Sequence, residues 1–390
     1  MKWKFYSLAF VAGMSILTAC SSDDNNDNDG NGGNGNGNEI ENGTILKGTI
    51  TSDVTLAAGN TYKLSGEYIV EEGATLHIEE GVKIIAVYDD IADYILVKQG
   101  GKINAVGTPD KPIVMTNEKE EPGAWGGIHI CGRAHTNAEG GKGSSEIGGA
   151  VYGGNDDADN SGTLQYIRLE YTGFAFDEEH EANGISFYGV GNGTIVDHCQ
   201  AYKGSDDGFE FFGGSVNVSN LVAVSCSDDS FDWTEGWNGK GTNLVAYQED
   251  KSTLGYDCDC LMECDNNGSN NAATPVAHPV LKNLILVGNG GSKQGIRLRA
   301  GTEVEIDNAK VCGKGQPLTV ETALTENALK NGTSKLTNIT LTSELSSKEG
   351  IYTHADFIAV TSNKVDANLS YSSFEDIRKE CSWMNGSWVK

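Results

Sequence analysis

The sequence predicts an all-β solenoid, in which the chain winds through successive coils and stacks parallel strands on one another. Two strand phrases recur along the chain, their spacing is nearly constant, and glycine is abundant. The 390 residues include 51 glycines and 6 prolines. Because each interior glycine costs a helix about 1 kcal/mol, this content disfavours helical bundles. Glycine follows no three-residue period, so the composition does not predict collagen either.

The first phrase places a polar residue before an apolar strand, at 220–224, 243–247 and 283–287, with looser copies starting at Tyr166, His198 and Asn338. These starts are 32, 22, 23, 40 and 55 residues apart in chain order. The second phrase is an alternating strand with a small residue in front, at 184–188, 208–212, 230–234 and 295–299. A period of 22–23 residues with two-residue alternation indicates a solenoid of strands, and longer spacings indicate inserted loops.

Glycine-cornered short strands extend the same pattern toward the N-terminus, at 66–70, 73–78, 81–84 and 101–105. The segments 321–328 and 374–379 read as helices, and Trp383 and Trp388 are expected to close the last coil, because solenoid ends need a cap. A β-sandwich is the alternative fold. A recurring unit of fixed length argues against it.

The first residues have the form of a secretory signal peptide, predicted over 1–20. Lys2 and Lys4 precede an apolar run at 8–17, which is too short to span a bilayer. Residues 17–20 end in Cys20 and resemble the lipobox of bacterial lipoproteins, which implies an acylated Cys20 that attaches the protein to a membrane. The alternative is an ordinary signal peptide with a chance cysteine. Residues 21–38 are rich in Asp, Asn and Gly and predict a disordered tether, followed by a β-helix domain over 39–390 that includes a C-terminal cap.

Two motifs carry a resemblance to a known group of proteins. They lie at 123–128 and at 205–214. Over about 43–313, the chain resembles the right-handed parallel β-helix proteins of the pectate-lyase-like superfold. More narrowly, it resembles a group of β-helix surface lipoproteins of Bacteroidetes, whose activity is poorly defined. Acidic residues after a lipidated cysteine resemble the surface-export signal of that phylum, which implies a lipid-anchored location on the outer membrane, facing outward.

Strand alternation predicts two outward-facing columns of side chains. If Ile185, Phe209, Phe231, Met262 and Ile296 point inward, their neighbours point outward. One column is then Ser186, Glu210, Asp232, Glu263 and Arg297, and the next is Tyr188, Phe212, Thr234, Asp265 and Arg299. The corner in front of these strands carries Asp206, Asp207, Asp228 and Asp229.

Carboxylates stacked about 4.8 Å apart repel one another by roughly 3 kcal/mol at an effective dielectric near 20. Three arrangements relieve this cost: Arg297 and Arg299 neutralise one end, Ca²⁺ bridges carboxylate oxygens, or some carboxyl groups stay protonated with a raised pKa. We therefore assign Asp206, Asp207, Asp228 and Asp229 as candidate Ca²⁺ ligands. The alternatives are a solvated acidic face and aspartates that only stabilise turns.

The acidic face is the predicted ligand site. Its candidate ligand-binding residues combine carboxylates, arginines and aromatic rings: Tyr188, Glu210, Phe212, Asp232, Trp237, Glu263, Asp265, Arg297 and Arg299. Trp237 is expected to be exposed, whereas strand parity turns Trp233 inward. The leading hypothesis is capture of a glycan or other nutrient, with an outer-membrane transporter as a further partner.

An enzyme is the first alternative, either a Ca²⁺-assisted polysaccharide lyase or a glycoside hydrolase. Its candidate catalytic residues are Asp232, Glu263, Arg297 and Arg299, with an arginine as the base of a lyase. The Gly-His-Gly motif of β-helix hydrolases is absent. A structural or adhesive surface protein is the second alternative. The formal charge of 28 − 55 = −27 argues against binding to nucleic acid.

After Cys20, an even number of cysteines remains: Cys131, Cys199, Cys226, Cys258, Cys260, Cys264, Cys312 and Cys381. An even number in an exported chain predicts disulfides, with Cys312–Cys381 as one reasonable pairing. A zinc cluster at Cys258, Cys260 and Cys264 is the alternative.

Overall fold

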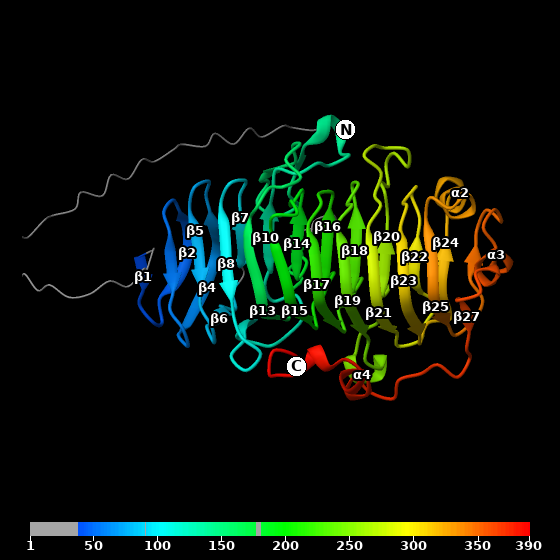
Figure 1. The fold of residues 1–390 in the computed structure, drawn as a ribbon. Coiled ribbons are helices and arrows are strands. Elements are labelled where there is room, and N and C mark those ends of the chain that lie inside the picture. Colours follow the sequence, from blue (N-terminus) through cyan, green and yellow to red (C-terminus); the bar gives the residue numbers. More distant parts are fainter. Residues whose placement is uncertain (1–37, 90, 177–180) are drawn as a thin grey trace, which may run out of the picture. The chain divides into compact units, whose positions relative to one another are not determined.

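The computed structural model describes residues 38–89, 91–176 and 181–390. The predicted signal peptide, Cys20 and the tether up to residue 37 lie outside the described residues. Within the described part, 25 strands form one continuous, wound sheet in which every ladder between these strands is parallel (Figure 1). In that part, no helix combines the length and the apolar character needed to cross a bilayer.

Three strand ladders run along the solenoid. The first, called the site face here, continues from the end of β4 through short strands, one per coil. They are β7 (Tyr94–Val97), β10 (Ile128–Cys131), β14 (Ile185–Tyr188), β16 (Phe209–Phe212), β18 (Phe231–Thr234), β20 (Met262–Cys264), β22 (Gln294–Leu298), β24 (Gln316–Val320) and β26 (Ser346–Ser347).

The other two ladders share long strands that bend once, so that one strand contributes to both. These are β13 (Gly162–Glu170), β15 (Ile195–Tyr202), β17 (Asn217–Val224), β19 (Lys240–Tyr247), β21 (Val280–Val287), β23 (Glu305–Cys312) and β25 (Lys335–Leu341), followed by β27 (Lys364–Val365). The first coils use β1 (Asn38–Ile40), β2 (Ile45–Ile50), β3 (Val54–Leu56), β4 (Thr61–Val70), β5 (Thr75–Ile78), β6 (Lys83–Ala86), β8 (Lys102–Val106) and β9 (Ile113–Asn117). β8 and β9 pair with the first and second halves of β13.

The bend explains the first recurring phrase of the sequence. Its polar residue is the corner residue and has a left-handed backbone, for example with φ of 56° at Asn220 and 60° at Asn243. Asn is one of the few residues that adopts this conformation readily, because its side chain bonds locally. The amide of Asn243 donates to Asn220 Oδ1 at 2.8 Å, and the amide of Asn283 donates to Asn243 Oδ1 at 3.0 Å. An unpredicted corner, Asn308, continues this asparagine ladder and divides the spacing of 55 residues in two.

The interior of the solenoid is lined by the residues that alternation assigned to it. Ile185, Phe209, Phe231, Met262 and Ile296 are all buried in one core cluster. Because identical faces superpose from coil to coil, aromatic rings stack along the axis: the Phe209 and Phe231 centroids lie 5.6 Å apart. Close packing between coils explains the small residue in front of these strands. At Gly208, for example, a Cβ would lie 2.7 Å from the Ser230 carbonyl oxygen of the next coil.

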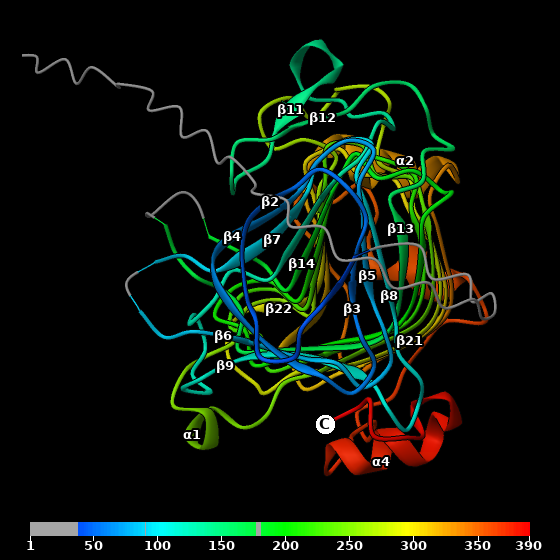
Figure 2. The same cartoon turned by 90° about the vertical axis from the view of Figure 1, so that its left-hand side faces the viewer.

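An insertion between β10 and β13 covers part of the site face. It contains the 3-10 helix η1 (Glu139–Gly141) and an antiparallel hairpin of β11 (Gly143–Ser144) and β12 (Val151–Tyr152) (Figure 2). Ile147 and Tyr152 of the insertion pack with outward residues of the site face, such as Leu96 and Tyr188, in a second buried cluster. The outward-facing positions of β7, β10, β14 and β16 are therefore buried.

The remaining helices are α1 (Lys251–Leu254), α2 (Ala323–Asn331), α3 (His354–Ala359), α4 (Phe374–Glu380) and the 3-10 helix η2 (Ser382–Met384). The two predicted helices correspond to α2 and α4. After β27, residues 366–390 form a strap that runs back beneath the solenoid (Figure 1). Trp388 is fully buried, with its ring 5.2 Å from that of His198 in β15, and the Trp383 ring lies 6.4 Å from the same histidine. The expectation that these two tryptophans close the last coil is therefore wrong.

The eight described cysteines all carry free, buried thiols, and no disulfide joins any of them. Cys312 and Cys381 do share one apolar cluster beneath the strap. The zinc alternative has no geometric support, because Cys264 points into the core whereas the Cys260 thiol faces Asp259 Oδ1 at 3.4 Å.

Candidate functional site

The first outward column has the register predicted from alternation. Across β14, β16, β18, β20 and β22, the ladder pairs Ser186 with Glu210, Glu210 with Asp232, Asp232 with Glu263, and Glu263 with Arg297. We call Glu210, Asp232 and Glu263 the acidic column. Parallel stacking therefore makes neighbours of carboxyl groups that lie 22 to 31 residues apart in the chain, as 210, 232 and 263.

Two arginines neutralise the last coil of this column. Arg297 Nη1 lies 2.9 Å from Glu263 Oε2, and its Nη2 lies 3.3 Å from Glu321 Oε2. Arg299 pairs with Glu263 as well, and its Nε lies 2.7 Å from Asp265 Oδ1. Glu263 and Asp265 are thus balanced by cations, and the predicted neutralisation at one end of the column is confirmed.

In the part of the chain that the structure describes, neither Glu210 nor Asp232 forms an ion pair, although the charge of Arg299 acts to lower the pKa of Asp232. Glu210 is 9% exposed, and its Oε2 accepts a hydrogen bond of 2.5 Å from the amide of Asn183. Oδ1 of Asp232 is buried and has no hydrogen-bond partner among the described residues. Burial, followed by the charges of neighbouring carboxylates, raises the pKa of both groups well above its ordinary value.

The corner aspartates, Asp206, Asp207, Asp228 and Asp229, all have a raised pKa, and two of them also accept hydrogen bonds from the backbone of the next coil. Oδ1 of Asp207 accepts the Asp229 N–H at 2.7 Å, and Oδ1 of Asp229 accepts the Cys260 N–H at 2.6 Å. Asp207 and Asp229 therefore each fasten the backbone of the next coil, 22 and 31 residues further along the chain. These bonds differ from the local turn bonds that the turn alternative predicted. Asp206 is 8% exposed, and burial with the nearby Asp228 raises its pKa to about 8.

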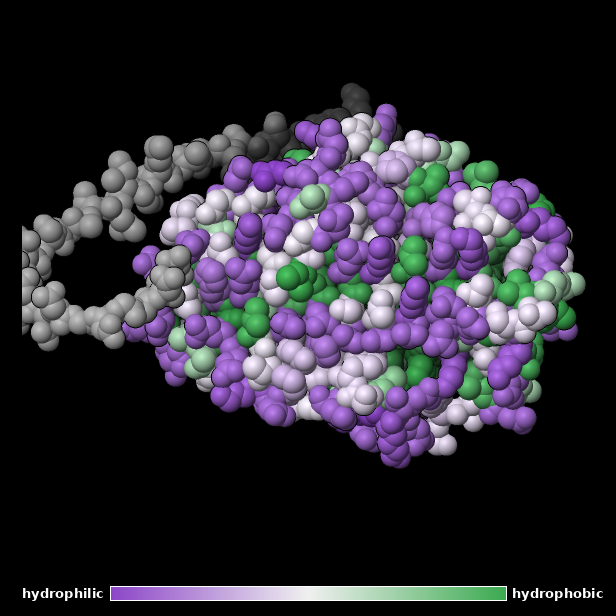
Figure 3. All heavy atoms as spheres, in the orientation of Figure 1, coloured by the Kyte–Doolittle hydropathy of each residue, from purple (hydrophilic) through white to green (hydrophobic). Residues whose placement is uncertain are grey.

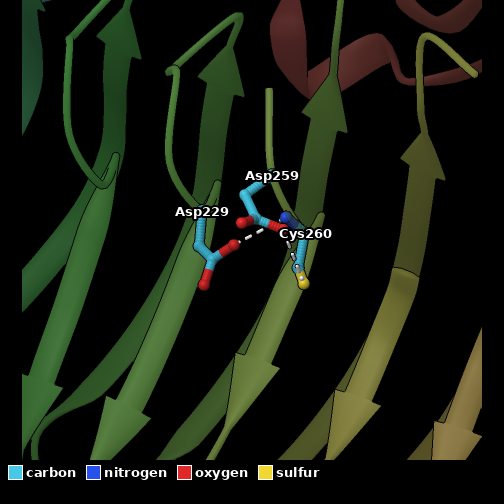
Figure 4. Close-up of side chains that lie close together, drawn as sticks. All are labelled: Asp229, Asp259 and Cys260. Carbon is cyan, nitrogen blue, oxygen red and sulfur yellow. Dashed lines mark hydrogen bonds between the residues drawn. The ribbon is translucent and has the colours of Figure 1, made fainter. Parts of the chain in front are cut away.

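Carboxylate oxygens converge in three groups along this edge. Asp206, Asp207 and Asp228 form one group, and Asp207, Glu210 and Asp232 form another; in each, the ligand atoms lie within 4.8 Å of one another. The third contains Asp229, Asp259 and Cys260, shown in Figure 4. The four predicted metal residues are therefore brought together, although Asp229 belongs to a different group from the other three.

The first two groups suit a hard divalent cation. They offer only carboxylate oxygens, which are the donors that Ca²⁺ prefers. Several of these carboxyl groups are buried close together, and Asp232 Oδ1 is left without a partner, so a bound cation would remove a repulsion that the protein itself leaves unbalanced. The residues present thus fit Ca²⁺. The third group adds a thiol and is already countered by Lys293, which pairs with Asp259.

The aromatic rings that were expected to edge the site are buried. Tyr188 is 0% exposed, Phe212 is 7% exposed, and their rings stack 4.4 Å apart beneath the insertion. Trp237 was expected to be exposed, but it is 1% exposed and its ring stacks on Phe211 in the core at 4.1 Å. These expectations of an open aromatic edge are wrong, because the insertion covers the second column and the chain after β18 turns inward.

Two residues of the site were not predicted. Asn183 stands two residues before its strand, as Asp207 and Asp229 do, and it reaches Glu210. Glu321 stands two residues after Thr319, which pairs with Arg297, just as Arg299 stands two residues after Arg297. Extending the predicted register by one coil at each end identifies both positions. No repeated sequence pattern, by contrast, predicts the insertion between β10 and β13.

The wound sheet, the parallel ladders and the superposed site residues together define a parallel β-helix protein. A family model described as a pectate-lyase like beta helix domain matches residues 48–389, and the chain belongs to this family. Neither the curated proteins nor the solved structures contain a match to the chain.

Proposed function

We propose that this protein is a lipid-anchored surface protein that captures a glycan or another nutrient on its acidic face, with Ca²⁺ held among the carboxylates. The observation that carries the proposal is the column itself, in which Glu210 and Asp232 are stacked in register beside Asp207, and neither forms an ion pair with a described lysine or arginine. Neither a solvated acidic face nor a turn role requires carboxyl groups to be buried side by side in this way. A bridging cation that also binds sugar hydroxyl groups does account for it.

The enzyme alternative has less support. Arg297 and Arg299 each lie between two carboxylates, and these contacts raise their pKa despite burial, so neither is suited to accept a proton as the base of a lyase. In an inverting hydrolase, the two catalytic carboxyl groups stand about 6.5–9.5 Å apart to admit a water. Oxygens of Asp207, Glu210 and Asp232 lie within 4.8 Å of one another, which is too close for that mechanism. The spacing approaches the separation of about 5–5.5 Å in a retaining hydrolase, so a retaining hydrolase is the form in which the enzyme alternative stays open.

The location is part of the same proposal. An acylated Cys20 at the end of a long polar tether would hold the β-helix at the outer-membrane surface, where captured material passes to a membrane transporter. Cleavage and acylation at Cys20 are tested by mass spectrometry of the membrane fraction, with Cys20→Ser as the control that should release the protein.

Cation binding has a test that requires no ligand. Because folding raises the carboxyl pKa values, the protein without metal should lose stability as pH rises from about 5 to about 8. Ca²⁺ should restore the melting temperature at about pH 8 and have little effect at about pH 5, where the carboxyl groups hold protons.

The control is Asp232→Asn, which removes the unpartnered charge but keeps the shape. It should raise the melting temperature in EDTA at about pH 8 and reduce the gain on adding Ca²⁺. Glycan arrays with and without EDTA then test capture. Equal melting temperatures in EDTA and Ca²⁺, with glycan binding unchanged by Glu210→Gln and Glu263→Gln, would show that the column is only acidic surface.

A further inference from the structure

We infer that a cavity at the end of the site face is a subsite for one or two units of a neutral saccharide. This inference rests on the proposed glycan capture and assigns it a place and a ligand class. The cavity has a volume of ≈ 660 Å³, within the roughly 300–1,000 Å³ of small-molecule sites. It lies where the insertion meets the loop after β20, and Figure 2 shows these two loops side by side above the solenoid.

The wall between the two loops is fixed by hydrogen bonds. The Asn137 amide donates to Asn266 Oδ1 at 2.8 Å and to the Pro275 carbonyl at 3.0 Å. The Asn267 amide donates to Asn137 Oδ1 at 3.0 Å, and the Asn137 N–H donates to the Glu235 carbonyl at 3.0 Å. A wall that is ordered before the ligand arrives loses less entropy on binding.

Other polar groups that line the cavity have no partner among the described residues. They are the hydroxyls of Thr234 and Ser269, the Glu139 carboxylate and the Asn270 amide nitrogen. A hydroxyl both donates and accepts, a carboxylate accepts, and an amide nitrogen donates. A sugar hydroxyl needs a donor and an acceptor at once, and this mixed set supplies both.

The charges select the class of saccharide. None of the described residues that line the cavity is a lysine or an arginine, whereas Glu139 and Glu235 are acidic. A uronic acid or a phosphorylated sugar would therefore meet repulsion without a compensating cation. Among the described residues that line the cavity, Ala138 has the one wholly apolar side chain, so the lining offers no large apolar group to a hydrophobic ligand. A neutral saccharide fits the lining best.

The position also connects the cavity with the acidic face. Thr234 belongs to the second outward column, in which it follows Phe212 in the ladder of β16 and β18. An oligosaccharide whose end occupies the cavity can thus extend toward Asp232 and Glu263, the half-buried members of the acidic column. The cavity would supply selectivity for the terminal unit, and the cation would supply additional affinity.

Calorimetry of the full chain with a panel of neutral trisaccharides (gluco-, manno-, xylo- and galacto-configured) and with trigalacturonate tests the inference. We expect at least one neutral trisaccharide to bind and trigalacturonate to bind more weakly. Ser269→Leu, which fills the cavity with an apolar side chain, should weaken binding at least tenfold. Thr234→Val, which removes one hydroxyl at constant shape, should weaken binding about three- to tenfold.

Ala272→Leu is the matched control, because Ala272 is exposed on the same loop but does not line the cavity. It should bind like the wild type, and all three variants should keep the wild-type melting temperature. Binding that persists in Ser269→Leu but is lost in Asp232→Asn or EDTA would overturn the subsite while leaving capture on the acidic face intact. Preference for trigalacturonate would also overturn it. Failure of the wild type to bind any member of the panel or of the glycan array would overturn capture itself.

Discussion

Asp93 is a buried carboxyl group outside the acidic column. It stands just before β7, is fully buried, and its Oδ1 accepts the Gly66 N–H at 2.5 Å. Its Oδ2 has no partner among the described residues. Burial, and to a smaller extent the charges of Asp89 and Glu118, raises its pKa from 3.8 to about 7.

This raised pKa predicts that the folding stability of the protein depends on pH. The folded state binds the Asp93 proton more tightly than the unfolded chain, so stability is lost as pH rises from about 4 through about 7. Asp93→Asn keeps the acceptor for Gly66 and removes the charge. It should raise the free energy of unfolding at about pH 8.5 by a few kcal/mol and change it little at about pH 4. Urea denaturation at both pH values measures this, and an equal effect at the two values would contradict it.

For single residues, the sequence predicted which side of a strand a side chain takes better than it predicted how exposed that side chain is. Alternation placed Glu210 and Asp232 on the outward side, and the ladder confirms it. The same alternation placed Tyr188 outward, and it is outward but fully buried. Alternation specifies which side of a strand a residue takes, but what covers that side comes from a distant part of the chain.

The bent strand is the element that gives the solenoid its shape. Each bend needs one residue with a left-handed backbone, and the chain supplies asparagine at five of the corners: Asn220, Asn243, Asn283, Asn308 and Asn338. A stacked asparagine bonds to the coil before it, so the corner fixes both the bend and the register. The corner needs both a left-handed backbone and a side chain that bonds to the coil before it, and few residue types meet both requirements. The phrase is therefore repeated in the sequence.

Two substitutions at Asn243 separate the contribution of the left-handed backbone from that of the side-chain hydrogen bonds. Asn243→Gly keeps the left-handed backbone and removes the side-chain bonds to Asn220 and from Asn283, which should cost about 1–2 kcal/mol of unfolding free energy. Asn243→Ala also strains the backbone and should cost about 1–2 kcal/mol more. Chemical denaturation measures both. Equal stability of the Ala and Gly variants would show that the left-handed corner carries no strain.

At the scale of the whole molecule, the strap joins coils that the sheet alone does not connect. Ile377, Met384 and Trp388 pack on outward residues of the bent strands, including Val222 and Ile285. At the end of the chain, Lys390 Nζ lies 3.0 Å from Glu170 Oε2 in β13. The strap therefore covers an apolar stripe that would otherwise face water, and it links β27 back to coils in the middle of the solenoid.

Removing residues 366–390 should expose this stripe. Each of the three buried side chains contributes about 1.5–3 kcal/mol before the entropy of ordering the strap is subtracted. We expect the truncated protein to melt at a lower temperature, bind a hydrophobic dye and associate in solution. The matched control is Lys379→Ala, which removes only an exposed ion pair of α4 with Asp376 and should leave all three measurements unchanged. A truncated protein that melts like the full chain would show that the strap is peripheral.

The sequence by itself determined the solenoid and the rows of side chains along it. Alternation has a fixed period of two, and the coil has a nearly fixed length, so positions along the chain convert directly into positions in a column. Tertiary structure decided which parts of those columns meet solvent. The insertion buries Tyr188 and Phe212, and together with the loop after β20 it encloses the cavity beside Thr234. The insertion shares no repeat with the strands that it covers, and its contacts with the loop after β20 join residues more than a hundred positions apart, such as Asn137 and Asn266, so nothing in the local pattern encodes them.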